Sequence, residues 1–178
     1  MTMRHKVFVS YHHANDQGYR IEFERWCKDV MDSRSVEEGD IDPNLNTETV
    51  RQRIREEYLR DSSVTVVLVG RQTWQRKHVD WEISSSIRHT ENNPRSGLLG
   101  ILLPNYPGFV EGTYNPHTIP PRLADNVKCG FASIHLWDQT PEAIQNWIHE
   151  AYLRKDRVNP DNSRVLFGKN HTGDRWQD

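Results

Sequence analysis

The sequence lacks any apolar run long enough to cross a membrane. Its longest apolar stretches, VTVVLVG at 64–70 and GLLGILLP at 97–104, are much shorter than the roughly 20 residues that a transmembrane helix needs. The N-terminal MTMRHK has no apolar segment of the kind that signal peptides carry. We therefore expect a cytoplasmic protein with no membrane partner.

The sequence also lacks an excess of positive charge. Its 178 residues include 23 Lys and Arg against 25 Asp and Glu, which gives a net charge of −2. Proteins that bind nucleic acid through its phosphates use an excess of Lys and Arg to displace counterions. The charge balance therefore predicts no nucleic-acid partner.

Metal-binding patterns and the common nucleotide-binding motifs are absent as well. The two cysteines, Cys27 and Cys129, lie too far apart for a metal-binding pair, and we expect both to be buried thiols. The rings of the adjacent His12 and His13 should diverge, and no carboxylate has a usable spacing, so we predict no metal site. The absence of G-x-G-x-x-G, P-loop and G-x-S-x-G motifs argues against oxidoreductases, NTPases and hydrolases built on them.

Buried strands and amphipathic helices alternate along the chain. The clearest strand is SVTVVLVG at 63–70, whose continuous β-branched residues are typical of a parallel strand covered on both faces. Further strands are predicted at 6–11, 35–37, 97–103 and 131–138, and helices at 19–31, 47–62, 79–92 and 140–157. The proline-rich segment 104–130 is predicted to be an irregular crossover with little helix before Leu123.

This alternation predicts an α/β protein with a flavodoxin-like, three-layer fold. Its five-stranded parallel sheet should have the order 2-1-3-4-5, with helices on both faces. Residues 1–156 would form this domain and 157–178 a C-terminal extension, with Val165, Leu166, Phe167 and Trp176 as its docking residues. Ligands of such sheets bind beyond the carboxyl ends of the strands at the switch point. SYHHAND at 10–16 and GRQTWQ at 70–75 should therefore form two lips of one crevice.

Two segments resemble the sequence boxes of TIR domains. HKVFVSYHHAND, at 5–16, is similar to the opening box, in which a strand ending in Phe-Val-Ser-Tyr precedes a polar loop and an acidic residue. TWQRKHVDWEISSSI, at 73–87, resembles the segment in which enzymatic TIR domains carry their essential glutamate beside a tryptophan. From about Lys6 to Arg154 the chain resembles bacterial TIR-like proteins of the Thoeris anti-phage type. The Arg-Asp-x-x-Pro-Gly loop of animal signalling TIR domains is replaced by VEEGDIDPNLN, at 36–46.

The resemblance implies a function, a substrate and several partners. It implies that residues 1–156 are a TIR-like domain that cleaves the nicotinamide–ribose bond of NAD and makes a cyclic ADP-ribose isomer. That product would be a second messenger that activates a separate NAD-depleting effector during phage infection. NAD would be the substrate, and no cofactor is implied. Because enzymatic TIR domains often need a trigger or assembly, a phage-derived trigger and a homo-oligomer are further partners to consider. The alternative function is a non-catalytic TIR-like interaction module.

On this resemblance Glu82 is the catalytic residue. Nicotinamide leaves NAD as a neutral molecule, so the barrier lies mainly in the cationic ribose, which a fixed carboxylate would stabilise. From periodicity alone, Glu82 would instead be a solvated acid near a helix N-terminus. Asp80 lies on a different helix face and is interpreted as a cap or first-turn acid.

Five residues around the two lips are predicted to bind the substrate. Ser10, Tyr11 and His12 offer hydrogen-bonding groups for a phosphate or ribose, although the same loop could merely cap the next helix through Asn15 or Asp16. Trp74 could stack on nicotinamide or adenine, or shield the end of the sheet. Phe8 could face the pocket, but its place in a strand favours the core.

Overall fold

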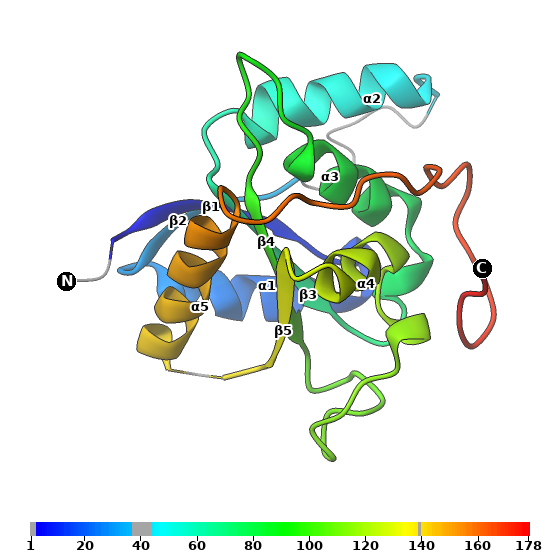
Figure 1. Ribbon diagram of the computed structural model, residues 1–178. Coiled ribbons are helices and arrows are strands. Elements are labelled where there is room, and N and C mark those ends of the chain that lie inside the picture. Colours follow the sequence, from blue (N-terminus) through cyan, green and yellow to red (C-terminus); the bar gives the residue numbers. More distant parts are fainter. Residues whose placement is uncertain (1–2, 37–43, 139) are drawn as a thin grey trace.

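The sheet has the predicted order. The structure, a computed structural model, describes residues 3–36, 44–138 and 140–178. Five parallel strands run in the order β2-β1-β3-β4-β5 (Figure 1). They are β1 (His5–Ser10), β2 (Met31–Arg34), β3 (Val64–Val69), β4 (Gly97–Leu102) and β5 (Ala132–Leu136). The α/β, TIR-like fold is therefore confirmed, and β3 lies at the centre because its residues are buried on both faces.

Helices cover both faces of the sheet (Figure 1). On one face Phe23 and Ile148, from helices α1 and α5, pack on Val66 and Leu68 of β3. On the other face Val79, Ile83 and Ile87 of α3 pack on the alternate residues Val67 and Val69. The helices are α1 (His13–Cys27), α2 (Thr47–Arg53), which continues as a π-helical segment (Ile54–Leu59), α3 (Lys77–Ile87), α4 (Pro121–Lys128) and α5 (Pro141–Arg154).

The first helix and second strand begin earlier than predicted. Helix α1 starts at His13, and the segment HHANDQG is not a loop, because Nδ1 of His12 accepts a hydrogen bond from the Asn15 backbone N–H at 3.2 Å and caps the helix. The predicted caps Asn15 and Asp16 lie inside α1. Met31, predicted as the last residue of this helix, instead begins β2 and is buried in the core.

Other element boundaries differ by smaller amounts. The prediction of a strand at 35–37 is wrong for residues 35 and 36, which follow the end of β2 at Arg34, and residue 37 lies outside the described residues. Asn46 caps α2 through its Oδ1, 2.8 Å from the Thr49 backbone nitrogen.

Within the described part of the chain, no helix combines the length and apolarity that spanning a bilayer requires.

The C-terminal segment 157–178 runs across α3 and α4 (Figure 1). The Trp176 indole N–H donates to the Ile119 carbonyl at 2.8 Å, and Phe167 is likewise buried. Val165, predicted as a docking residue, is 86% exposed and does not dock. Asn170 Oδ1 accepts a hydrogen bond from the backbone N–H of Lys77 at 2.9 Å, so this segment caps the N-terminus of α3 from outside.

The two cysteines differ in accessibility. Cys27, the last residue of α1, is buried in the core, and burial raises its thiol pKa to about 12. Cys129 is exposed after α4, so the prediction that both thiols are buried is wrong for Cys129. The short helix α4 ends at Lys128, which leaves Cys129 in the turn that follows.

A thiol-reactive reagent should therefore label Cys129 alone in the folded protein. Because the thiolate is the nucleophile, Cys27 should react only once denaturant exposes it. Mass spectrometry of the digested protein checks this, with Cys129→Ser as the control that should show almost no labelling under native conditions. Labelling of Cys27 in the native protein at its rate in denaturant would contradict the described burial.

Candidate active site

Glu82 and Ser10 meet beyond the buried end of β1. Ser10 is the last residue of β1, and its hydroxyl donates a hydrogen bond to Oε2 of Glu82, which lies in the second turn of α3. Glu82 is only 1% exposed and Ser10 is fully buried. The structure thus brings together two predicted site residues that are far apart in the sequence.

The apolar spacing of α3 explains why Glu82 faces β1. Val79, Ile83 and Ile87 recur every four residues and turn one face of α3 onto the sheet. Glu82 lies three residues after Val79, so its side chain leaves the helix at the edge of this apolar face. That position carries the carboxyl group to Ser10 and away from solvent.

Burial dominates the electrostatics of Glu82. It raises the pKa of the carboxyl group to about 8, and the hydrogen bond from Ser10 opposes the shift. With a pKa of about 8, the carboxyl group of Glu82 can be protonated or ionised near neutral pH, depending on the charge of the group that binds beside it. The interpretation of Glu82 as a solvated surface acid therefore does not describe this structure.

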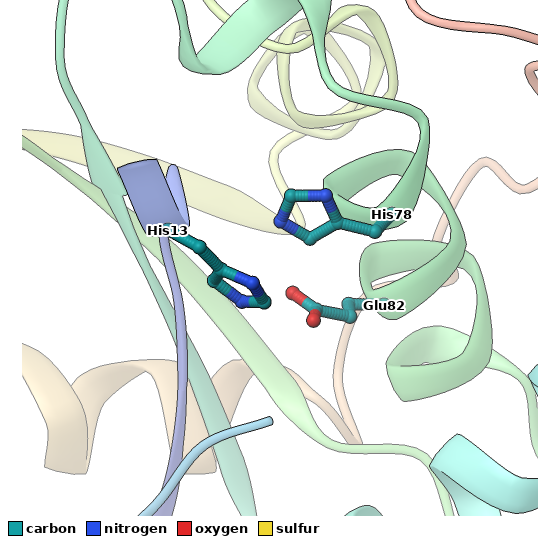
Figure 2. A group of neighbouring side chains, drawn as sticks. All are labelled: His13, His78 and Glu82. Carbon is teal, nitrogen blue, oxygen red and sulfur yellow. The ribbon is translucent and has the colours of Figure 1, made fainter. Parts of the chain in front are cut away.

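Two imidazoles lie beside this carboxyl group (Figure 2). The rings of His13 and His78 have centroids 4.3 Å apart, and Nε2 of His78 lies 3.2 Å from the carbonyl oxygen of Tyr11. Burial, followed by the neighbouring His13, lowers the pKa of His78 to about 3, so its ring is uncharged at neutral pH. Sequence reasoning missed His78, although its position four residues before Glu82 places both side chains on one face of α3.

Asp16 joins the two lips of the predicted crevice. It lies in the first turn of α1, is fully buried, and accepts a hydrogen bond from the Asn105 side chain at 2.8 Å. Desolvation raises the pKa of its carboxyl group. A Cβ at Gly70, just past β3, would collide with Oδ2 of Asp16, so only glycine permits this close approach. The ends of β1, β3 and β4 are thereby held together.

The other predicted substrate-binding residues are packed into the protein. The Tyr11 ring is fully buried, and its hydroxyl donates to Oε1 of Gln17 at 2.6 Å. Phe8 packs against Trp81 and residues of α2, while Trp74 lies edge-on to His171 of the C-terminal segment. His12 caps α1, and burial lowers its pKa to about 4. Their roles in substrate binding stay predictions.

Two hollows of the described surface do not include Glu82 in their lining. One lies beside the β1–β2 edge and includes Lys6, Arg34 and Tyr58 in its lining. Another lies at the end of the C-terminal segment, beside His117 and Trp176. Glu82 itself is buried, with 1% of its surface exposed.

Asp80 holds the opposite side of α3. Its carboxylate accepts two hydrogen bonds from the Arg122 guanidinium, at 2.9 and 3.3 Å, and both side chains are almost completely buried. It also accepts the Phe167 backbone N–H at 3.0 Å, and Arg122 donates to the Arg164 carbonyl. Asp80 is therefore a first-turn acid with a structural partner, and it gives no cap to α3.

A parallel sheet in the order 2-1-3-4-5 with helices on both faces fits a TIR-like domain. The family model described as the TIR-like domain of the Thoeris protein ThsB matches residues 8–107, more than half of the 178 residues. The chain belongs to this family and is a TIR-like protein of Thoeris defence. The matched residues include Ser10, His13, His78 and Glu82. A search of curated proteins found no match.

Proposed function

We propose that the protein consumes NAD and makes a cyclic ADP-ribose isomer. The observation that carries this proposal is the buried carboxyl group of Glu82, held by Ser10 where the carboxyl ends of β1 and β3 meet. This is the edge of a parallel sheet at which α/β proteins bind their ligands. The product would be a second messenger that activates a separate NAD-depleting effector in the cytoplasm of a phage-infected cell.

The reaction needs stabilisation of a cation more than it needs an acid. When the bond between C1′ of the ribose and the nicotinamide nitrogen breaks, its electron pair leaves with nicotinamide, which becomes neutral. The positive charge then lies on the ribosyl group, and a nucleophilic atom of the same ADP-ribose attacks C1′ to close the ring. One proton is released from that nucleophile, and the carboxylate of Glu82 would accept it.

The environment of Glu82 suits this role. Around neutral pH the carboxyl group of Glu82 is largely protonated, since burial raises its pKa to about 8. The positive nicotinamide ring of NAD favours the ionised form, so substrate binding should release a proton. In a partly dry pocket the resulting carboxylate interacts strongly with the ribosyl cation. Exclusion of water also favours ring closure over hydrolysis to linear ADP-ribose.

The burial of Glu82 leaves a second candidate, a non-catalytic TIR-like interaction module. One experiment separates the two functions: purified protein is incubated with NAD, alone and in lysate from phage-infected cells, and nicotinamide is measured. Release above that of a Glu82→Gln control supports the enzyme. If both proteins give equal release in buffer and lysate, the module is favoured. Chromatography of the products distinguishes the cyclic isomer from linear ADP-ribose.

Ser10→Ala should slow nicotinamide release about tenfold or more. The substitution removes the hydroxyl donor from Glu82, and hydrogen bonds to charged groups contribute roughly 1.5–3 kcal/mol. The matched control is Ser85→Ala on α3, the helix that carries Glu82. The buried Ser85 hydroxyl has no hydrogen-bond partner among the described residues. Single-turnover rates of both variants check the prediction. Equal rates for Ser10→Ala and wild type would remove Ser10 from the reaction.

A further inference from the structure

Three metal-ligating side chains converge beside the end of β1. His13 opens α1, while His78 and Glu82 lie one turn apart on α3. One ligand atom of each lies within 4.8 Å of those of the other two. Figure 2 shows the two imidazoles and the carboxyl group gathered around a common space. The prediction of no metal site was based on the adjacent pair His12 and His13. In the fold, His13 instead lies beside His78 and Glu82 of α3.

The donor set fits one class of cation. Imidazole nitrogen and carboxylate oxygen suit zinc and related late transition metals, whereas calcium and magnesium prefer oxygen alone. Zinc sites that react with exogenous ligands use three protein ligands and leave the fourth position open. With bonds of about 2.0–2.1 Å, the ligand atoms of a tetrahedral site lie about 3.4 Å apart. The ligand atoms, which lie within 4.8 Å of one another, would approach to this separation on binding.

Neighbouring groups already orient two of the ligands. Ser10 donates to Oε2 of Glu82, and the His78 ring is fixed by its contact with the Tyr11 carbonyl oxygen. Metal-ligating carboxylates and imidazoles are usually held by such outer hydrogen bonds. A bound ion would displace the proton of Glu82, and burial leaves little water to compete with the ion for the resulting carboxylate.

We propose that His13, His78 and Glu82 bind a divalent cation of the zinc class, and that the bound ion switches the site off. The second part rests on the proposed function. A coordinated Glu82 shares its negative charge with the ion and no longer stabilises the ribosyl cation. The ion's positive charge would also oppose entry of the positive nicotinamide ring of NAD.

The test is a titration of the full-length protein, freed of metal by a chelator, with Zn²⁺ alone. We expect about one ion per chain, and the visible spectrum of the Co²⁺ form should show tetrahedral coordination. His13→Asn, His78→Asn and Glu82→Gln should each weaken Zn²⁺ binding at least about tenfold, since losing only an outer partner already costs about 10–100-fold. The matched control is His12→Asn, which removes the adjacent imidazole and keeps a good helix cap, and it should bind Zn²⁺ like wild type.

Three results would overturn the site: no binding by wild type, undiminished binding by all three ligand variants, or loss of binding in His12→Asn. Should a ligand variant fail to fold, zinc-edge X-ray absorption on the wild-type protein decides instead. A first shell containing imidazole nitrogen supports the site, and a shell of oxygen alone rejects it.

Nicotinamide release, measured in EDTA and in Zn²⁺, separates this inference from the proposed function. If wild type releases nicotinamide in EDTA and Zn²⁺ abolishes this release, both the proposed function and the inhibitory metal site are supported. If Zn²⁺ binds through the three residues but no Glu82-dependent release occurs under any condition, the metal site is supported and the proposed enzymatic function is rejected. Release that Zn²⁺ leaves unchanged rejects the inhibitory role and keeps the enzyme.

Discussion

Glu82→Gln is expected to lower nicotinamide release from NAD by at least about 100-fold. Removing one preorganised electrostatic group from an active site typically costs about 2.7–4 kcal/mol of transition-state stabilisation. Glutamine has nearly the same shape and still accepts the hydrogen bond from Ser10, but it cannot carry the negative charge that the ribosyl cation needs. The rate should therefore fall while the local packing stays intact.

Stability measurements make the Glu82→Gln result interpretable. The carboxyl group is buried and its pKa is already raised to about 8, so a neutral amide should cost the fold little. We expect the thermal unfolding temperature of the variant to match or exceed that of wild type. Glu142→Gln, at an exposed position on α5, is the control and should change neither property. Wild-type release rates in folded Glu82→Gln would end the assignment of Glu82 as catalytic.

Arg122→Ala is expected to destabilise the protein by about 3–5 kcal/mol, the largest effect on folding among the substitutions considered. The truncation leaves the Asp80 carboxylate buried without its cation, and breaking a buried ion pair from one side costs this much. It also removes the donor that holds the Arg164 carbonyl, so the C-terminal segment loses an anchor. The midpoint of urea unfolding, monitored by tryptophan fluorescence, measures the change.

Arg164→Ala provides the matched control for Arg122→Ala. Arg164 also pairs with an aspartate, Asp125, but both side chains of this pair are partly exposed, at 24% and 21%. Solvent screening limits such pairs to about 1 kcal/mol or less. If the two variants unfold at similar urea concentrations, the burial of the Asp80–Arg122 pair contributes no more to stability than a partly exposed pair does.

Continuous apolar strands and regular helix spacing made the architecture predictable. Val64–Val69 can be covered on both faces only at the centre of a parallel sheet, and the four-residue repeat of Val79, Ile83 and Ile87 gives α3 a single sheet-facing side. Polar helix starts were harder to predict. The segment after Ser10 looks like a loop until the His12 side chain is seen to cap α1, and caps depend on side-chain conformation as well as residue type.

The site was predictable only where a local signal existed. Glu82 and Ser10 came from short motifs that resemble TIR domains, and the structure joins them. His13 and His78 could not be paired from the sequence, because their approach depends on how α1 and α3 pack around the end of β1. Arg122 lay in a proline-rich segment with no periodic signal, and its partner Asp80 is 42 positions away.

The C-terminal segment is hydrogen-bonded to α3, the helix that carries Glu82. Asn170 caps α3 and Phe167 binds Asp80, only two positions from Glu82. A protease or a fusion tag that dislodged the last residues would therefore disturb the support of that helix while cutting nothing within the sheet. Assays for NAD cleavage should therefore keep Phe167 and Asn170 in place on α3, because their loss would alter the measured rate.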